Sequence, residues 1–237
     1  MTRATPIWKA IANALRNDIS ERLYAAGDKL PTEAALATRF GVNRHTVRQA
    51  LAALADEGLV HSRRGAGVFV TMTPTDYPIG RRVRFHQNLA AAGRSPAKKV
   101  LLLETRPAHS AEADALGIMQ GSKVHVYEGL SMAENQPIAL FHSAFPADRF
   151  PDLPVHLAEN PSVTTALQRS GVTDYTRAST RVNAKLATAT QALHLQIAEH
   201  APILRTIGIN VDSDGIPVEV GRTWFAGDKV TLTLDGS

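Results

Sequence analysis

The sequence contains no cysteine, and this absence removes several kinds of chemistry at once. Disulfide bonds, metal sites built from thiolates and cysteine nucleophiles are all excluded. Long apolar runs are also missing, since no stretch approaches the roughly 18 residues that a membrane-spanning helix needs. The N-terminal residues carry no apolar signal-peptide region either, so we expect a cytoplasmic protein with no membrane partner.

Catalytic and metal-binding patterns are equally scarce. The nine histidines show no HExxH motif and no paired metal spacing, so a surface or hydrogen-bonded role explains each of them better. Asp212, Asp214 and Gly215 are similar to the start of a calcium loop, but the glutamate that should follow is misplaced. A hairpin turn explains them instead. We therefore expect no catalytic residues, no metal and no cofactor.

The charge and the sequence rhythm divide the chain into two domains. Residues 1–73 hold ten Lys/Arg and six Asp/Glu, whereas residues 74–237 hold sixteen of each, so the net charge of +4 lies in the first part. Such an excess is what a polyanionic partner of one domain requires. We assign residues 1–73 to the first domain, 74–82 to a proline-containing linker and 83–237 to the second domain.

Residues 30–70 predict a helix, a tight turn, a second helix and a β-hairpin. Thr32 and Asn43 are expected to cap the two helices, and Gly41 to end the first. Each helix has apolar residues at helical spacing on one face. These residues are Leu36, Ala37 and Phe40 in the first helix, and Val47, Ala50, Leu51 and Leu54 in the second. A preceding helix over residues 8–24 is expected to bury either Ile7, Ile11, Leu15 and Ile19, or Trp8, Ala12, Leu15 and Ile19.

Basic residues mark the surface of this winged helix-turn-helix that would meet DNA. Arg44, His45 and Arg48 lie outside the apolar face of the second helix, and Arg63 and Arg64 lie at the hairpin tip. A helix of this kind enters the major groove, where arginine reads a guanine edge, and the tip meets phosphates or the minor groove. The alternative is an ordinary helical hairpin with a solvated charged face. The two basic regions together favour DNA.

Four motifs identify a family for this domain: residues 30–33 (LPTE), 40–48 (FGVNRHTVR), 54–60 (LADEGLV) and 65–70 (GAGVFV). They resemble the DNA-binding domain of GntR-type bacterial repressors. Ala34 stands where some members have an arginine that touches DNA, so that contact is absent here. The resemblance, with the basic tip, implies DNA contacts from Asn43, Arg44, His45, Thr46, Arg48, Arg63, Arg64 and Gly65.

The second domain is expected to have an α+β fold built from two similar units. A short helix ending at Leu116 precedes one predicted hairpin, and a helix ending at Leu195 precedes another. Two such units can pair into one antiparallel sheet with helices on its faces and a pocket between the halves.

This domain resembles the UTRA effector-sensing domain of the HutC branch of the GntR family, which has a chorismate-lyase-like antiparallel sheet with helices. The resemblance covers residues 83–235 and is carried by residues 84–93, 136–138 and 215–219. Within this branch, the regulators of phosphonate-utilisation genes are the most similar. That likeness depends on residues 75–78, 84–89 and 177–181. It implies a repressor controlled by a small anionic effector of phosphonate or phosphate metabolism.

An anion sensor needs arginines and free amides around a pocket. Arg177 and Arg181 are four residues apart on a predicted strand, so we expect them on one face, which is either the pocket or a solvated surface. The resemblance adds Ser162 and Glu219 as ligand-contacting positions. The full predicted effector site is Arg84, His86, Gln87, Asn88, Ser162, Arg177, Arg181 and Glu219.

Several alternatives remain open from the sequence. Sugar-phosphate sensors of this branch use two arginines where this chain has Gly129 and Ser131, which argues against such an effector. A HutC-branch regulator of another pathway, for histidine and urocanate or for amino-sugar phosphates, is the first alternative. An enzyme that uses the chorismate-lyase-like domain and a DNA-architectural protein without an effector are the others. In the main interpretation the partner is a two-fold symmetric operator in double-stranded DNA, bound by a homodimer.

Overall fold

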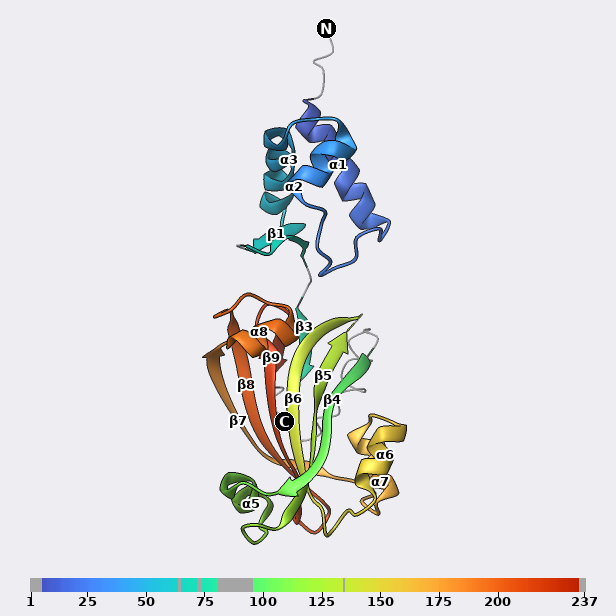
Figure 1. Ribbon diagram of the computed structural model, residues 1–237, viewed down its shortest axis with the longest axis vertical. Helices are drawn as coiled ribbons and strands as arrows, with labels where there is room; N and C mark the ends of the chain where they lie inside the picture. Colours follow the sequence, from blue (N-terminus) through green and yellow to red (C-terminus); the bar gives the residue numbers. More distant parts are fainter. Residues whose placement is uncertain (1–5, 64, 72–73, 81–95, 134, 235–237) are drawn as a thin grey trace. The chain divides into compact units, whose positions relative to one another are not determined.

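The computed structural model describes residues 6–63, 65–71, 74–80, 96–133 and 135–234 (Figure 1). The chain divides into two compact units, Met1–Thr73 and Pro74–Ser237, and each has a hydrophobic core of its own. Within the described ranges, no helix is both long enough and apolar enough to cross a lipid bilayer.

The first unit is a three-helix bundle followed by a hairpin. Its elements are α1 (Ile7–Ser20), α2 (Glu33–Phe40), α3 (Arg44–Asp56), β1 (Val60–Arg63) and β2 (Gly67–Val70). Thr32 Oγ1 accepts a hydrogen bond from the Ala35 amide at 3.2 Å and so caps α2. Asn43 Oδ1 accepts one from the Thr46 amide at 2.8 Å and caps α3. Gly41 ends α2 in the left-handed conformation, so the predicted turn is confirmed.

The core of this unit confirms the predicted apolar face of α3 and corrects that of α1. Ile11, Ala12 and Leu15 are buried, and Trp8 packs against them. Ile7 is 63% exposed because it lies in the first turn of α1, outside the core. The helix also ends at Ser20 rather than at residue 24. The buried residues of α3 are Val47, Ala50, Leu51 and Leu54, as predicted.

The second unit is built on one six-stranded antiparallel sheet (Figure 1). The strand order is β4-β5-β6-β9-β8-β7. The strands are β4 (Pro96–Pro107), β5 (Lys123–Ala133), β6 (Gln136–Pro146), β7 (Thr176–Leu186), β8 (Pro202–Val211) and β9 (Pro217–Ala226). Hairpins β5–β6 and β8–β9 meet in the centre, where β6 pairs with β9. The two predicted helix–hairpin units therefore do join into one sheet.

Helices cover both faces of this sheet. One face packs against α5 (Ser110–Leu116) and α8 (Ala189–Leu195), through clusters around Leu116 and Leu195. The other face packs against α6 (Leu153–Glu159) and α7 (Val163–Arg169), through a cluster that includes Tyr127 and Phe145. α6 lies in a stretch of the sequence that is rich in proline. Proline is tolerated in the first turn of a helix, and α6 has one there.

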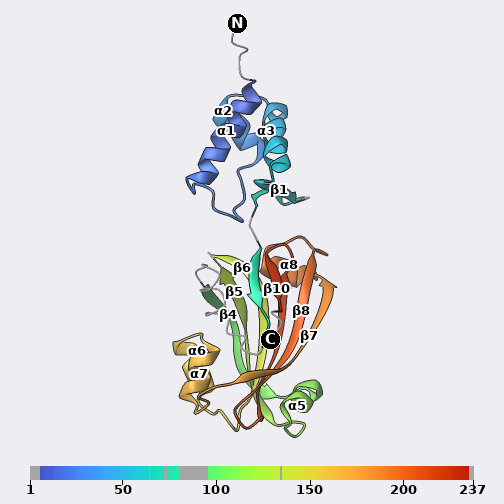
Figure 2. The same cartoon turned by 180° about the vertical axis from the view of Figure 1, so that it is seen from behind.

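The predicted linker is partly wrong, because its residues include a strand of the second unit. β3 (Thr75–Pro78) pairs in parallel with β10 (Val230–Thr233), as Figure 2 shows from behind. Thr75 and Tyr77 alternate inward and are 3% and 5% exposed, so burial holds this short segment in place. A strand of four residues that ends in a proline carries too little pattern for the sequence to show it. Residues 81–82 of the predicted linker lie outside the described part.

Candidate functional site

The start of α3 presents the predicted DNA-contacting side chains to solvent. Asn43, Arg44, His45 and Arg48 are exposed, and Thr46 is half-buried. Asn43 Oδ1 is occupied by the cap, since it accepts from both the amide and the hydroxyl of Thr46. Arg44 has no hydrogen bond or ion pair with any residue that the structure describes, so its guanidinium is available to a partner.

Arg48 is held in place by the preceding helix. Its guanidinium donates two hydrogen bonds to Glu33, at 3.0 Å from Nε and 2.7 Å from Nη2. The Arg48 bond holds the pKa of Glu33 below its usual range. A paired, planar guanidinium has a fixed direction, which suits it to read one base edge. Glu33 is therefore a positioning residue that the sequence analysis did not assign.

The hairpin β1–β2 carries the remaining predicted contacts. Gly65 and Gly67 have positive φ angles of 75° and 118°, which the tight turn requires. Arg63 lies over the Phe69 ring, with 4.5 Å between the guanidinium carbon and the ring centroid, and its Nε contacts His61 at 3.1 Å. Arg64, predicted at the tip, lies outside the described residues.

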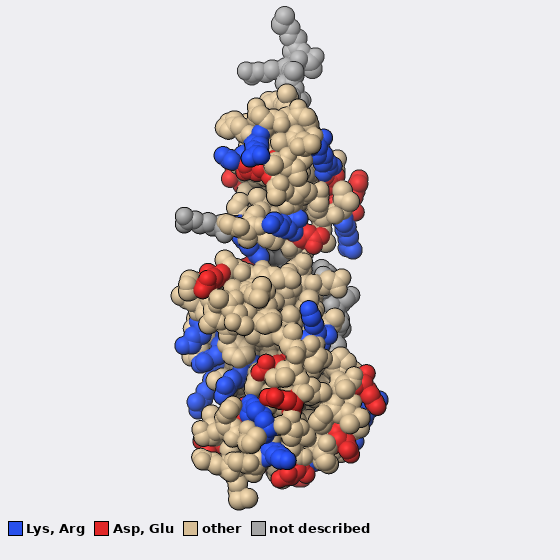
Figure 3. All heavy atoms as spheres, in the orientation of Figure 1, with Lys and Arg blue, Asp and Glu red and all other residues tan. Residues whose placement is uncertain are grey.

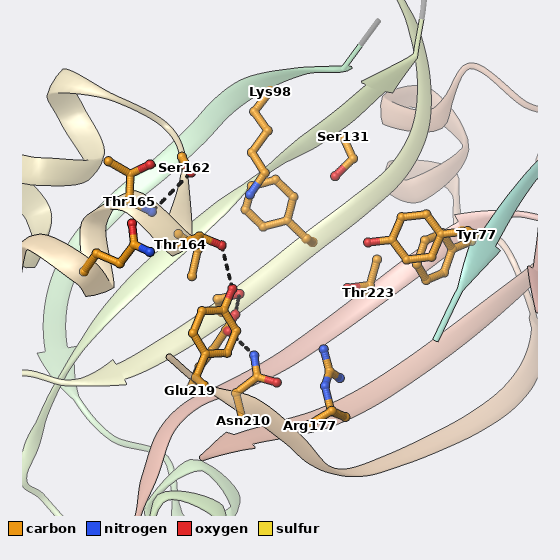
Figure 4. Close-up of a pocket in the computed structure, with 16 residues that line it drawn as sticks. Tyr77, Lys98, Ser131, Ser162, Thr164, Thr165, Arg177, Asn210, Glu219 and Thr223 are labelled. Carbon is orange, nitrogen blue, oxygen red and sulfur yellow. Dashed lines mark hydrogen bonds between the residues drawn. The ribbon is translucent and has the colours of Figure 1, made fainter. Parts of the chain in front are cut away.

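A pocket of about 350 Å³ lies in the second unit, on the side of the sheet that α6 and α7 cover. Figure 4 shows side chains from both halves of the sheet, from β3 and from the start of α7 around it. The lining residues are Tyr77, Lys98, Ser131, Phe141, Ser143, Ser162, Val163, Thr164, Thr165, Gln168, Tyr175, Arg177, Asn210, Glu219, Thr223 and Phe225.

Two glycines form part of the sheet surface beneath this pocket. Gly208 and Gly221 are directly paired across β8 and β9. The guanidinium of Arg177 occupies the place that a Cβ at Gly208 would take, so this glycine gives the arginine its room. A Cβ at Gly221 would meet only Glu219 and Ser143, at 3.5 and 3.7 Å. The lack of a side chain at Gly208 thus leaves room for the Arg177 guanidinium, and the lack of one at Gly221 leaves space beside Glu219.

Glu219 is a buried carboxylate in this pocket, only 8% exposed. Ser143 Oγ donates to its Oε1 at 2.6 Å, and Asn210 Nδ2 donates to its Oε2 at 2.6 Å. Figure 4 shows Glu219 and Asn210 side by side, with Arg177 beyond the asparagine. Both oxygens are thus satisfied by neutral donors.

Arg177 lines the pocket, but Arg181 does not, so the prediction that they share a face is wrong. Arg177 pairs with Asn210, whereas Arg181 pairs with Ile207, which faces the other side of β8. The register shifts between Arg177 and Ser179, and this bulge moves every later residue of β7 to the opposite face. Basic side chains gather along the β7 side of the surface in Figure 3. Arg181 is an exposed residue of the face opposite the pocket.

Lys98 brings a second cation to the pocket from β4. Its ammonium lies over the rings of Phe141 and Tyr127, 4.7 and 5.4 Å from their centroids. Burial lowers the pKa of Lys98 to about 8, and the attraction of Glu219 offsets part of that shift. Lys98, Asn210 and Tyr77 were not among the predicted effector residues. A lysine at a strand start and an asparagine in a hairpin carry no motif, and the motif around Tyr77 does not show that its side chain reaches a pocket.

The other predicted effector residues divide into two groups. Ser162 lines the pocket and caps α7, accepting from the Thr165 amide at 3.3 Å. Arg84, His86, Gln87 and Asn88 lie outside the described residues. Within the described ranges, no cluster of His, Asp and Glu side chains is arranged to hold a metal ion.

Gly129 and Ser131, the two positions at which sugar-phosphate sensors carry arginines, both lie on β5. Ser131 lines the pocket. Gly129 lies against Phe141 and the backbone of Lys99, so a side chain at this position would collide with both. Phe141 thus fills the space that an arginine at position 129 would need.

Comparisons with known proteins match both units. Residues 8–70 match the gntR family of bacterial regulatory proteins, and residues 91–231 match the UTRA domain. The transcriptional regulator RB1450 of Rhizobium meliloti (strain 1021) is 39% identical, over 97% of this chain and 94% of its own length. PhnF of Escherichia coli (strain K12), described as a probable transcriptional regulator, is 34% identical over 96% and 94%.

Solved structures show the same fold. The crystal structure of PhnF from Mycobacterium smegmatis aligns with a TM-score of 0.64 and 24% identity, covering 96% of this chain and 99% of that one. The α+β architecture with an N-terminal helix-turn-helix and a C-terminal antiparallel sheet is therefore shared with that protein.

Proposed function

Because the chain belongs to the GntR family of bacterial regulators and carries a UTRA domain, we propose that it represses genes of phosphonate or phosphate metabolism. The family consists of transcriptional regulators rather than enzymes. In this proposal a small anionic effector binds the second unit and releases the operator. The observation that carries it is Arg177, a guanidinium that lines the pocket without a partner among the described residues and with a buried Nε.

The DNA-binding half of the proposal depends on α3 and the wing. Arg44 and Arg48 are exposed at the start of α3, where a helix in the major groove meets base edges. Selecting bound duplexes from a random library with the full chain would define the operator. Adding phosphonates and phosphate esters to that complex then tests the effector. A chain that selects no sequence, or whose operator complex ignores every anion, would contradict the proposal.

In this proposal the effector acts through β3, which follows the DNA-binding unit directly in the sequence. Tyr77 lines the pocket and packs on Phe225, with 5.1 Å between ring centroids. It belongs to β3, the first strand after the boundary between Thr73 and Pro74. A ligand that contacts Tyr77 differently in two arrangements of β3 shifts the balance between them by its differential affinity.

We expect the protein to act as a homodimer on a two-fold symmetric operator. One winged helix covers too few base pairs for selective binding in a genome, and symmetry doubles the sequence that is read. Sedimentation of the full chain should give a dimer, and footprinting should protect two inverted half-sites. A monomer that protects a single half-site would contradict this prediction.

Raising the pH through about 8 is expected to weaken the binding of an anionic effector. The Lys98 ammonium predominates below its pKa and is lost above it, and a bound anion favours the charged form. Affinity for a phosphonate should therefore be greatest below this pKa and should fall as the lysine deprotonates. Calorimetry between about pH 7 and 9.5 measures this, with Lys98→Arg as the control because arginine stays charged throughout. Identical profiles for the two proteins would show that Lys98 does not contribute.

A further inference from the structure

Each face of the sheet has a buried carboxylate, and the two carboxylates differ in their hydrogen-bond partners. On the face of α5, Glu112 accepts from Arg106 at 2.8 and 2.9 Å and lies 3.1 Å from His142 Nε2. Burial would raise the pKa of Glu112, but these bonds outweigh it and hold the pKa at about 2. This cluster is complete in itself, since the Arg106 guanidinium pairs with the carboxylate through two hydrogen bonds.

Glu219, on the pocket face, has no such partner. Its two hydrogen bonds come from Ser143 and Asn210, which are neutral. No ion pair joins its carboxylate to any residue in the described part of the chain. Lys98 is near enough for Glu219 to affect its pKa, yet the burial of Lys98 still lowers that pKa to about 8. A buried carboxylate without a cationic partner favours a ligand that supplies one.

Arg177 lies near Glu219 and is a cation without an anionic partner among the described residues. Its guanidinium lies over Gly208, and Glu219 Oε1 lies beside the open space over Gly221. These two glycines are directly paired, and the Cβ positions of such a pair are about 5 Å apart. The Arg177 guanidinium and the Glu219 carboxylate therefore lie on two sides of one small region, and a single small molecule can reach both. Asn210 lies between the two side chains and keeps them from pairing directly (Figure 4).

We propose that the effector is a zwitterion, whose anionic group binds Arg177 and whose protonated amine binds Glu219. This inference rests on the proposed function, since it names the class of anion that the second unit senses. The charges of the described lining residues agree with it. The charges of Lys98 and Arg177, less that of Glu219, leave the pocket with one net positive charge. An aminoalkylphosphonate with a doubly ionised phosphonate and a protonated amine carries one net negative charge.

The competing interpretation is that Glu219 accepts a hydrogen bond from a hydroxyl group of an anionic ligand. An ammonium and a hydroxyl are similar in size, but only the ammonium gains the charge attraction of a carboxylate that forms no ion pair with the described residues. The difference between the two ligands therefore measures whether Glu219 acts as a charge or only as an acceptor.

The test is calorimetric titration of the full chain with three matched series of phosphonates. Each chain length, from one to three carbons, is offered with a terminal amine, a terminal hydroxyl and a terminal methyl group. At one chain length we expect the amine to bind about tenfold or more tightly than its hydroxyl and methyl counterparts. Equal binding of the three, or a preference for hydroxyl, would overturn the zwitterion while leaving the anion sensor standing. Binding of no phosphonate and no inorganic phosphate would overturn both.

Glu219→Gln separates a charge effect from a loss of folding. Glutamine has the same shape and can still bond to Ser143 and Asn210 by reorienting its amide. The variant should bind the amine ligand more weakly and the methyl ligand more tightly, because the carboxylate no longer attracts the ammonium or repels the phosphonate. A misfolded variant would lose both ligands, so opposite changes are diagnostic. Parallel changes for the two ligands would contradict the proposal.

Discussion

Replacing Arg44 by alanine is expected to lower the affinity for the selected operator by roughly 30-fold to 10⁴-fold, with little change in binding to unrelated DNA. A bidentate arginine–guanine contact contributes about 1–3 kcal/mol of discrimination, and a symmetric dimer makes it twice. Arg44 is exposed at the start of α3 and has no partner among the described residues, so no other contact of the protein compensates. Competition titrations at fixed salt, with operator and scrambled duplexes, measure the ratio.

Two companion variants make this result specific. Arg44→Lys keeps the charge but loses the planar fork, so it should retain non-specific affinity and lose selectivity if Arg44 reads a base. Arg22→Ala removes one positive charge from an exposed position outside α3 and serves as the charge-matched control. Arg48→Ala should behave like Arg44→Ala, since Glu33 aims its guanidinium. Full operator discrimination in the Arg44 and Arg48 variants would show that α3 is not the recognition helix.

Replacing Arg177 by alanine is expected to make the repressor insensitive to its effector. Removing the cationic partner of a buried anion costs about 2–5 kcal/mol, which is roughly a 30-fold to 4000-fold loss of affinity. The readout is the concentration of the best phosphonate of the panel that half-releases the operator. It should rise by that factor for Arg177→Ala.

Arg181→Ala is the matched control, because the bulge in β7 places Arg181 on the face opposite the pocket. Gly208→Ala offers an independent route to the same result, since its Cβ would take the place of the Arg177 guanidinium and displace it. If Arg177→Ala responds normally, or if Arg181→Ala is as insensitive as Arg177→Ala, the pocket assignment is wrong while the DNA-binding assignment survives.

Local signals were sufficient for the DNA-binding unit. α2 begins at the Thr32 cap and ends at Gly41, α3 begins at the Asn43 cap, and each of these signals acts within four residues of the chain. The apolar face of α3 follows from helical spacing, and the basic side chains lie on the remaining, exposed face. Packing was needed to show that the buried face of α1 combines residues of the two predicted alternatives, Ile11 from one and Ala12 from the other.

The pocket of the second unit depended on pairings that no local pattern contains. Arg177 and Arg181 share a face in any regular strand, and only the register of β7 against β8 revealed the bulge that separates them. Tyr77 reached the pocket through β3, a strand held by its pairing with β10, more than 150 residues along the chain. The sequence by itself determined the family, the two-unit organisation and the helix predicted to contact DNA, because caps and periodicity are local. Which charges face one another in the pocket was decided by the tertiary structure, because sheet register joins residues that are distant in sequence.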